Sequence, residues 1–430
     1  MPRDRVSLVR YAVTTFGCRV NQADSLQLEA ELRGRGAVRA PVDEADVVVI
    51  NTCSVTATAD QGTRQTLRRV ARLNPDAQLV VTGCYATRAS EVIEALPGAP
   101  VVVPNDEKHT IADRLLGDGT PSTADRYGDG AGACGAPLTP GLVGRAAFML
   151  RVQTGCDQPC AYCVIPTTRG RGRSLPLPHI DRAVDHAVQG GFREVVLTGV
   201  HLGSFGRDLE PRTSLLELLH ALDRHPSDVR FRISSLEPMD CPQALIDLVA
   251  ASGRFVPHFH LPLQHASDRM LRRMRRPYSI ADYSATVERI RGLLPDAAIG
   301  SDLIAGFPGE SEADAEQTVA YVANSPLTYL HVFPYSARPG TEAAGLPGRV
   351  PGPVIRERAK RLRAVGQQLS AAFTRRQVGQ TREALGLDAD GLVLTDNYLK
   401  VRVPAGVTPN TLLRVRIDAA APLTGVATPR

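Results

Sequence analysis

Short apolar runs alternate with amphipathic segments along the first hundred residues. The pattern predicts three strand–helix pairs, at 11–17 and 22–33, at 46–51 and 57–73, and at 78–83 and 87–96. Repeated pairs of this kind are typical of a parallel sheet whose strands are joined by crossover helices. We therefore predict an α/β domain over residues 1–116.

The periodicity stops at 117–144, where Gly, Ala and Pro dominate, and this composition predicts a linker. Cys134 lies inside it without neighbouring ligands, and we assign it no role. Alternation then resumes. Strands are predicted at 149–154, 194–199, 230–235, 258–263, 298–304 and 329–335, with helices near 179–190, 213–224, 242–251, 267–275, 280–294 and 311–324. Six consecutive βα units favour a barrel or partial barrel over an open sheet, and we place it at 145–373.

The last segment, 374–430, contains short runs of alternating apolar and polar residues, which predict a small β-barrel. The fold class expected for the chain is therefore α/β. It has an N-terminal parallel α/β domain, a central six-unit (βα) partial barrel and a small C-terminal β-barrel.

Composition narrows the functional classes only slightly. The chain has 430 residues, of which 43% are hydrophobic, and a net charge of +5, which permits a polyanionic partner without requiring one. No stretch approaches the roughly 18 uninterrupted apolar residues of a membrane span, so we expect a cytoplasmic protein with no membrane contact. In that reducing compartment, its eight cysteines are better interpreted as metal ligands or catalytic thiols than as disulfides.

Three cysteines follow the three N-terminal strands: Cys18, Cys53 and Cys84. Parallel strands end at one edge of a sheet, so the thiols should converge there if the strands are close in the sheet order. Each could instead be a small buried apolar residue, but three in register favour a shared metal site. Three thiolates suit an iron–sulfur cluster with one open iron, or a zinc site with an open position. Asn21 and Asn51 are expected to serve turns or caps.

Three further cysteines, Cys156, Cys160 and Cys163, lie on the loop after the first strand of the predicted barrel. A structural zinc site normally needs four protein ligands, and no fourth Cys or suitably spaced His follows. Three thiols can instead bind three irons of a four-iron cluster and leave the fourth iron open. The stretch "HFHLPLQH" resembles a histidine metal site, but we interpret His258 and His260 as ordinary residues on one face of a strand.

The spacing Cys156-x3-Cys160-x2-Cys163, with Tyr162 before the last Cys, resembles the cluster motif of radical S-adenosylmethionine enzymes. Together with "GCRVN", "NTCSVT" and "TGC", it is similar to the methylthiotransferases of that superfamily. The resemblance implies two [4Fe–4S] clusters, one on each cysteine triplet, and S-adenosylmethionine as the source of a radical. It also implies a cofactor site lined by residues of the barrel mouth: Tyr162, Gly199, Ser235, Glu237, Gln264 and Gly306.

The same resemblance implies the substrate. Family members insert a methylthio group into an adenosine beside the tRNA anticodon, or into an aspartate of a ribosomal protein. "GCRVNQADS" and the residues after Cys53 are most similar to the branch that acts on C2 of N6-threonylcarbamoyladenosine at position 37. Methylthiolation of N6-isopentenyladenosine is the alternative, and a non-catalytic, metal-containing RNA-binding protein is the alternative of another class. The expected partners are the tRNA anticodon loop and proteins that donate electrons and sulfur.

Basic residues near the predicted active mouth and in the C-terminal domain fit contacts to RNA phosphates. "TDNYLKVRVP" resembles the closing motif of the TRAM RNA-binding domain and carries Lys400 and Arg402. "TRGRGR", beside the second cysteine triplet, carries Arg169, Arg171 and Arg173. The predicted helix at 267–275 adds a broad group of arginines, some of which we expect in intramolecular ion pairs.

Overall fold

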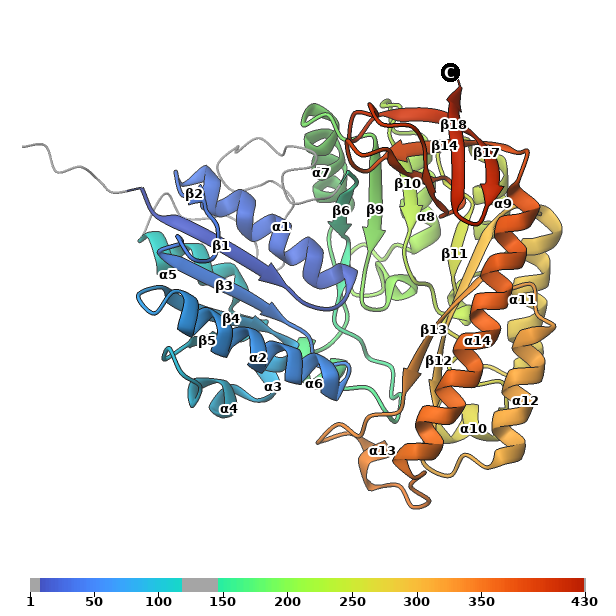
Figure 1. Cartoon of the computed structure of the whole chain (residues 1–430), viewed down its shortest axis with the longest axis horizontal. Helices are drawn as coiled ribbons and strands as arrows, with labels where there is room; N and C mark the ends of the chain where they lie inside the picture. The colour runs from blue at the N-terminus through green and yellow to red at the C-terminus, as the bar shows by residue number, and fades with distance from the viewer. Residues whose placement is uncertain (1–7, 118–145, 429–430) are drawn as a thin grey trace, which may run out of the picture. The chain divides into compact units, whose positions relative to one another are not determined.

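The structure is a computed structural model that describes residues 8–117 and 146–428. The predicted linker, apart from Gly117, and Cys134 therefore lie outside the described residues. The chain divides into two compact units (Figure 1). In its described part, unit 1 comprises 8–117, 149–157 and 164–186, and unit 2 comprises 146–148, 158–163 and 187–428. The domain limits expected from the sequence stay predictions.

Unit 1 contains a five-stranded parallel sheet with the strand order β2-β1-β3-β4-β5. Its strands are β1 (Arg10–Thr15), β2 (Val38–Arg39), β3 (Val47–Thr52), β4 (Gln78–Gly83) and β5 (Val101–Val103). Its helices are α1 (Arg19–Gly34), α2 (Ala57–Leu73), α3 (Cys84–Arg88), α4 (Ser90–Glu94) and α5 (Ile111–Leu116), with the 3-10 turn η1 (Lys108–Thr110).

Helices cover both faces of this sheet. Residues of α1 and α5 pack with one set of strand side chains, and residues of α2, α3 and α4 pack with the alternate set. Every residue of β3 is buried, as expected for a central strand covered on both faces. The N-terminal parallel α/β sheet predicted from the sequence is confirmed.

The six strands of the predicted barrel are β6 (Phe148–Arg151), β9 (Glu194–Thr198), β10 (Arg230–Ile233), β11 (His258–His260), β12 (Ala298–Ala305) and β13 (Tyr329–Pro334). The parallel pair β9–β10 and the parallel trio β11–β12–β13 are joined by parallel bridges, including Ser235 to His260. Two short strands, β7 (Gln153–Thr154) and β8 (Arg173–Ser174), and helix α6 (Ile165–Arg169) belong to the segment around the second cysteine triplet.

The other helices of this region are α7 (Leu177–Gln189), α8 (Leu215–Asp223), α9 (Gln243–Ala251), α10 (Asp268–Arg273), α11 (Ile280–Leu293), α12 (Glu312–Ala323), α13 (Glu342–Gly345) and α14 (Gly352–Gln377), with the 3-10 turns η2 (Leu202–Ser204) and η3 (Pro238–Asp240). Helices α11 and α12 begin with complete capping boxes, in which Ser279 pairs with Asp282 and Ser311 with Asp314. Within the described ranges, no helix is long and apolar enough to cross a membrane.

The C-terminal strands close into a five-stranded barrel with the order β14-β15-β16-β18-β17 (Figure 1). They are β14 (Thr381–Gly386), β15 (Leu392–Thr395), β16 (Lys400–Arg402), β17 (Leu412–Ala420) and β18 (Leu423–Thr428). The core of this barrel includes Val393, Val401 and Val415, together with Phe373 of α14 and Ala298 of β12. The predicted small C-terminal β-barrel is confirmed.

Candidate active site

The three N-terminal cysteines lie at one edge of the unit 1 sheet. Cys18, Cys53 and Cys84 follow β1, β3 and β4, which are neighbours in the strand order. Cys18 is exposed, whereas Cys53 and Cys84 are buried. Burial, together with smaller contributions from Cys18 and Cys84, raises the pKa of the Cys53 thiol to about 12. The strand order therefore brings together the three thiols that the sequence placed at strand ends.

Gly17 gives this cysteine group the space it needs. A Cβ at this position would lie 2.4 Å from Cys53 Cβ and 2.6 Å from its Sγ. The φ angle of Gly17 is also +91°, a conformation that side chains rarely adopt. Only glycine therefore lets the chain leave β1 and enter α1 this close to the Cys53 thiol.

Asparagine side chains hold the strand ends beside the thiols. Asn21 Nδ2 donates to the carbonyls of Phe16 and Thr52, each at 2.8 Å, and Asn51 Nδ2 donates to the carbonyl of Asn21 at 2.8 Å. These bonds tie the start of α1 to the ends of β1 and β3. Both asparagines therefore bond to the backbone, but they join separate elements and do not form the turns or caps expected from the sequence.

A buried group of cations lies next to Cys84. Burial raises the pKa of the Cys84 thiol, but Arg169 and Lys108 outweigh this effect and the pKa is lowered. Asp24 forms ion pairs with Lys108 and Arg169, each at 2.9 Å, and also with Arg151. Burial, followed by repulsion from Arg169, lowers the pKa of Lys108 to about 7. Arg169 and Lys108 thus act on the Cys84 thiol as positive charges, so this side of the cysteine group suits an anionic thiolate-ligated group.

The second triplet lies on the loop between β7 and α6. Cys163 N donates to the carbonyl of Cys160 at 3.1 Å, which folds the Cys160–Cys163 segment into a turn. Arg276 Nη1 donates to Cys160 Sγ at 3.3 Å, and the same guanidinium is ion-paired with Glu237. The Arg276 side chain is 2% exposed and lies over the Tyr278 ring. A guanidinium donating to sulfur favours the thiolate form, which is the form that binds metal.

The residues expected to line the cofactor site come from the same end of unit 2. Gly199 follows β9, Ser235 and Glu237 follow β10, and Gly306 follows β12 with a φ of +80°. Tyr162 packs edge-on against Phe307, with ring centroids 6.5 Å apart. The backbone of Gln264 is bonded to Asp302 and Ile304 of β12. These positions line the strand ends where α/β barrels hold their reactive groups.

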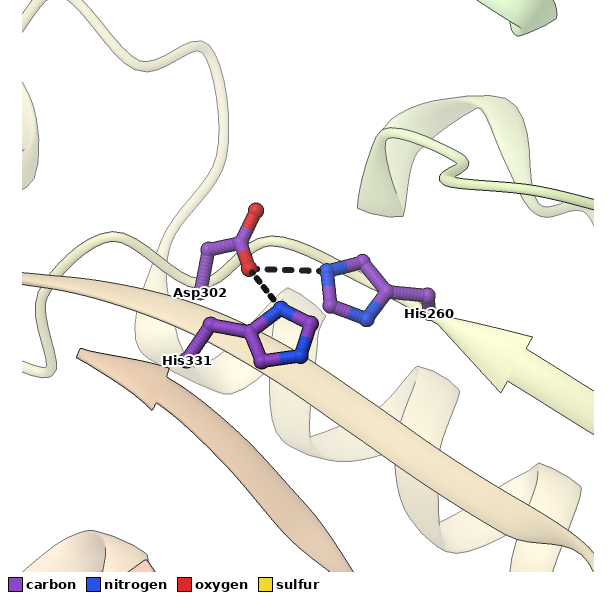
Figure 2. Close-up of side chains that lie close together, drawn as sticks. All are labelled: His260, Asp302 and His331. Atoms are coloured by element: carbon purple, nitrogen blue, oxygen red, sulfur yellow. Dashed lines mark hydrogen bonds and ion pairs between the residues drawn. The ribbon is translucent and has the colours of Figure 1, made fainter. Parts of the chain in front are cut away.

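Histidines that the sequence did not connect to other polar residues form a cluster on β11, β12 and β13. His260 Nε2 lies 2.9 Å and His331 Nδ1 lies 3.1 Å from the same oxygen, Oδ1 of Asp302. Figure 2 shows both imidazoles pointing at this carboxylate. The interpretation of His258 and His260 as same-face strand residues is correct in position, but it missed these partners. Asp302 is 42 residues from His260 and 29 residues from His331 in the sequence, so no local pattern could have revealed these contacts.

The basic residues considered for RNA contact have different surroundings. Lys400 and Arg402 are exposed on either side of buried Val401 in β16. The Arg171 side chain is 93% exposed. Arg169 is buried and donates to Asn21 and Asp24, so we leave it out of any RNA contact. Arg173 is partly buried and donates to the carbonyl of Arg169 at 3.1 Å.

The arginines in and next to the predicted helix at 267–275 do not form a single exposed basic face. Arg272 is exposed, whereas Arg276 is buried against Cys160. Arg273 donates to the carbonyls of Pro308 and Pro347, and Arg275 is ion-paired with Glu342. Internal hydrogen bonds and ion pairs therefore involve Arg273, Arg275 and Arg276, and they reduce the number of cations available to a phosphate backbone.

Two family models match the chain. Residues 10–103 match the uncharacterized protein family UPF0004, and residues 150–322 match the radical SAM superfamily. Among curated proteins, the chain is 34% identical to the threonylcarbamoyladenosine tRNA methylthiotransferase MtaB of Rickettsia prowazekii, over 92% of this chain and 91% of the relative. It is 33% identical to the tRNA-2-methylthio-N(6)-dimethylallyladenosine synthase of Acidothermus cellulolyticus, over 96% of this chain and 84% of the relative.

Among solved structures, the chain is similar to the radical S-adenosylmethionine methyltransferase TsrM from Kitasatospora setae. The TM-score is 0.56 with 14% sequence identity, over 78% of this chain and 77% of that one. At this identity the likeness concerns the fold alone.

Proposed function

Because the chain belongs to the radical S-adenosylmethionine methylthiotransferase family, we propose that it inserts a methylthio group at C2 of N6-threonylcarbamoyladenosine, at position 37 beside the anticodon of tRNA. The main support is the similarity to two proteins of this activity over most of the length of both chains. The MtaB proteins of Rickettsia prowazekii and Bacillus subtilis are each 34% identical to this chain over more than nine tenths of its length. Both proteins are named as threonylcarbamoyladenosine tRNA methylthiotransferases, and this supports the substrate proposed here.

The donor sets fit the two [4Fe–4S] clusters that this function requires. Cys156, Cys160 and Cys163, whose spacing resembles the radical S-adenosylmethionine motif, would hold the cluster that works with S-adenosylmethionine. Arg276 donates to the Cys160 sulfur and favours its thiolate form. The other triplet would hold the second cluster, at an edge made electropositive by Arg169 and Lys108. When bound, these groups supply the radical and the sulfur, while the protein provides binding, orientation and electrostatics.

Unit 2 would bind and orient S-adenosylmethionine through the residues around its strand ends. Glu237 is held by the buried Arg276, so its carboxylate is fixed beside the cysteine loop. Gly199 and Gly306 let the backbone approach a ligand closely, and Ser235 and Gln264 add hydrogen-bonding groups. Lys400, Arg402 and Arg171 are the exposed cations that we propose for contact with tRNA phosphates.

A second candidate function is methylthiolation of the dimethylallyl-substituted adenosine. It is supported by the tRNA-2-methylthio-N(6)-dimethylallyladenosine synthase of Chloroflexus aurantiacus, which is 36% identical to this chain over 89% of its length. The two substrates differ only in the N6 substituent, so assays with each substrate must separate the two functions. Dependence on proteins that donate electrons and sulfur, and a place in the cytoplasm, stay predictions.

The decisive experiment uses the anaerobically purified protein with its iron and sulfide restored. It is given S-adenosylmethionine, a reductant and anticodon stem-loop RNA that carries either threonylcarbamoyladenosine or dimethylallyladenosine. Mass spectrometry of the nucleosides should show methylthio product from the first RNA and at most a trace from the second. Product from the dimethylallyl RNA alone would replace the proposed substrate, and no product from either RNA would overturn the proposed function.

A further inference from the structure

A continuous chain of hydrogen bonds crosses three neighbouring strands of unit 2. His258 Nε2 lies 2.8 Å from Tyr329 Oη, and the same hydroxyl lies 3.1 Å from His260 Nδ1. His260 Nε2 then bonds to Asp302, and His331 bonds to the same carboxylate oxygen (Figure 2). Five polar side chains of β11, β12 and β13 are thus linked in one row.

The strand register builds this row. Asp302 is the direct partner of His331, and Gly300 is the direct partner of both Tyr329 and His260. A Cβ at position 300 would lie 1.9 Å from Tyr329 Cζ and 2.3 Å from its hydroxyl. The glycine therefore lets the Tyr329 ring lie across β12 and reach the histidines of β11.

The hydrogen bonds also fix which ring nitrogens carry protons. Asp302 Oδ1 accepts from both imidazoles, so His260 Nε2 and His331 Nδ1 are donors. Burial raises the pKa of Asp302, but the two imidazoles outweigh this effect and the pKa falls below its usual range. The carboxylate is therefore ionised at neutral pH. The Nε2 atom of His331 is the ring nitrogen at the exposed end of the row.

The row lies on the strand face that leads to the cysteine loop. On β13, Leu330 points to α14, where it approaches Gly366, so His331 and Tyr335 lie on the opposite face. Ile304 and Tyr335 continue the face of Asp302 and His331, and both pack against the buried cluster that contains Ala161, a residue between Cys160 and Cys163. The His331 side chain is 52% exposed, whereas that of His260 is 11% exposed. A ligand between the cysteine loop and this row would meet His331 first.

We propose that His331, held by Asp302, recognises the carboxylate of the threonylcarbamoyl group by donating a hydrogen bond from Nε2. This inference rests on the proposed function and identifies a residue that selects its substrate. Because Nδ1 donates to Asp302, donation from Nε2 as well requires both ring nitrogens to carry protons, which is the imidazolium form. The imidazolium then lies between two carboxylates, one of the protein and one of the substrate.

The chemistry of the two N6 substituents explains the selection. The threonylcarbamoyl group ends in a carboxylate and a hydroxyl, whereas the dimethylallyl group is a branched hydrocarbon. A site with a charged hydrogen-bond donor discriminates strongly against a ligand that has no acceptor. When such a ligand binds, the donor of the protein loses its contact with water and gains no hydrogen-bond partner. His331 would therefore favour the first substituent and disfavour the second.

The test compares two anticodon stem-loop RNAs, one with the threonylcarbamoyl group as the free acid and one with the same group as its carboxamide. Binding is measured by fluorescence anisotropy, and kcat and KM by mass spectrometry of the product. The wild type should prefer the acid by about 10- to 100-fold in kcat/KM, the range expected for a hydrogen bond between charged partners. In His331→Ala this preference should disappear, mainly through a raised KM.

Two further variants control for structural effects. His331→Asn keeps a short donor toward Asp302 but lacks a group at the Nε2 position, so it should also lose the preference. His220→Ala changes an exposed histidine of α8 outside the row and should behave as the wild type. A loss that is equal for the acid and the carboxamide would indicate a structural role and would overturn the proposal, as would an unchanged preference in both His331 variants.

The same three side chains could instead hold a metal ion, since their ligand atoms all lie within 4.8 Å of one another. Metal analysis of the cluster-loaded wild type and His331→Ala should give equal metal contents, because we propose an organic ligand. Loss of one metal ion per chain in the variant would overturn the proposal in favour of a metal site. If the wild type forms no methylthio product from the acid RNA, the proposed function fails. If the wild type forms this product and His331→Ala retains the preference for the acid, only the recognition by His331 fails.

Discussion

Glu194 holds a buried ion-pair triad that joins the partial barrel to the C-terminal β-barrel. Its side chain is 0% exposed, and its two oxygens lie 2.8 Å from Arg232 Nε and 3.2 Å from Arg230 Nη2. Arg232 is 1% exposed and donates onward to the carbonyls of Thr395 and Asp396. Burial lowers the pKa of Arg230, although Glu194 opposes this shift. Glu194 is therefore the carboxylate that bonds to two guanidinium groups with little access to solvent, and Asp396 and Glu383 act more weakly on Arg230.

Glu194→Gln keeps the shape of the side chain and removes its charge. We expect it to destabilise this region by about 3–5 kcal/mol, the usual cost of leaving a buried charge without its partner. At 1.4 kcal/mol for each factor of ten, the opening equilibrium of β10 and of the Thr395–Leu399 turn should rise by about two to three and a half orders of magnitude. Hydrogen exchange followed by mass spectrometry measures this opening directly in the folded protein.

Two comparisons show whether the triad is the cause. Asp418→Asn removes a charge from the exposed Arg416 pair and should change local exchange by less than about 1 kcal/mol. Replacing Glu194, Arg230 and Arg232 together by Leu, Met and Leu should recover most of the loss, because apolar residues of similar volume remove the desolvation cost of all three charges. If Glu194→Gln exchanges no faster than Asp418→Asn, the carboxylate does not stabilise this region as argued.

Three predictions follow from the proposed sites. Replacing Cys156, Cys160 and Cys163 by Ala should leave about half of the iron and abolish cleavage of S-adenosylmethionine, measured by iron analysis and chromatography; loss of all the iron would contradict two independent sites. Replacing Cys18, Cys53 and Cys84 should remove the methylthio product while cleavage of S-adenosylmethionine persists, and a folded, iron-loaded variant without cleavage would contradict this division. Lys400→Ala combined with Arg402→Ala should lower the salt dependence of tRNA binding by at most about two units of slope, and an unchanged slope would exclude phosphate contacts at these residues.

Elements with strong hydrophobic periodicity were predictable from the sequence, and weakly patterned elements were not. Helix α2 and strand β4 lie where they were predicted. The segment 87–96 was predicted as one helix, but it forms α3 and α4, because Ala89 leaves the helical region with a φ of −141°. The long helix α14 was missed. Only a few of its 26 residues are buried, and its many arginines obscure the helical periodicity of its apolar residues.

The convergence of the first cysteine triplet was predictable because it depends on topology alone: parallel strands end at one edge, and each thiol follows a strand. The pairing of charges depends on distances that only the folded register supplies. Asp302 and His331 lie on separate strands, and Arg276 is 116 residues from Cys160. The spacing of the cysteines therefore indicated the site, whereas the side chains that tune it had no local signal.

The arginines of "TRGRGR" show how the fold divides one sequence motif between two roles. Arg169 points into unit 1, where it meets Asp24, a residue 145 positions earlier, and Arg171 is two residues further on and almost fully exposed. Arg169 is a buried cation beside Cys84 and lowers the pKa of that thiol. Arg171 is exposed, so its attraction to a polyanion acts through solvent and is screened by salt. The two arginines should therefore respond differently to ionic strength. Any effect of Arg169 on a cluster held by Cys84 should persist at high salt, whereas an effect of Arg171 on tRNA should fade.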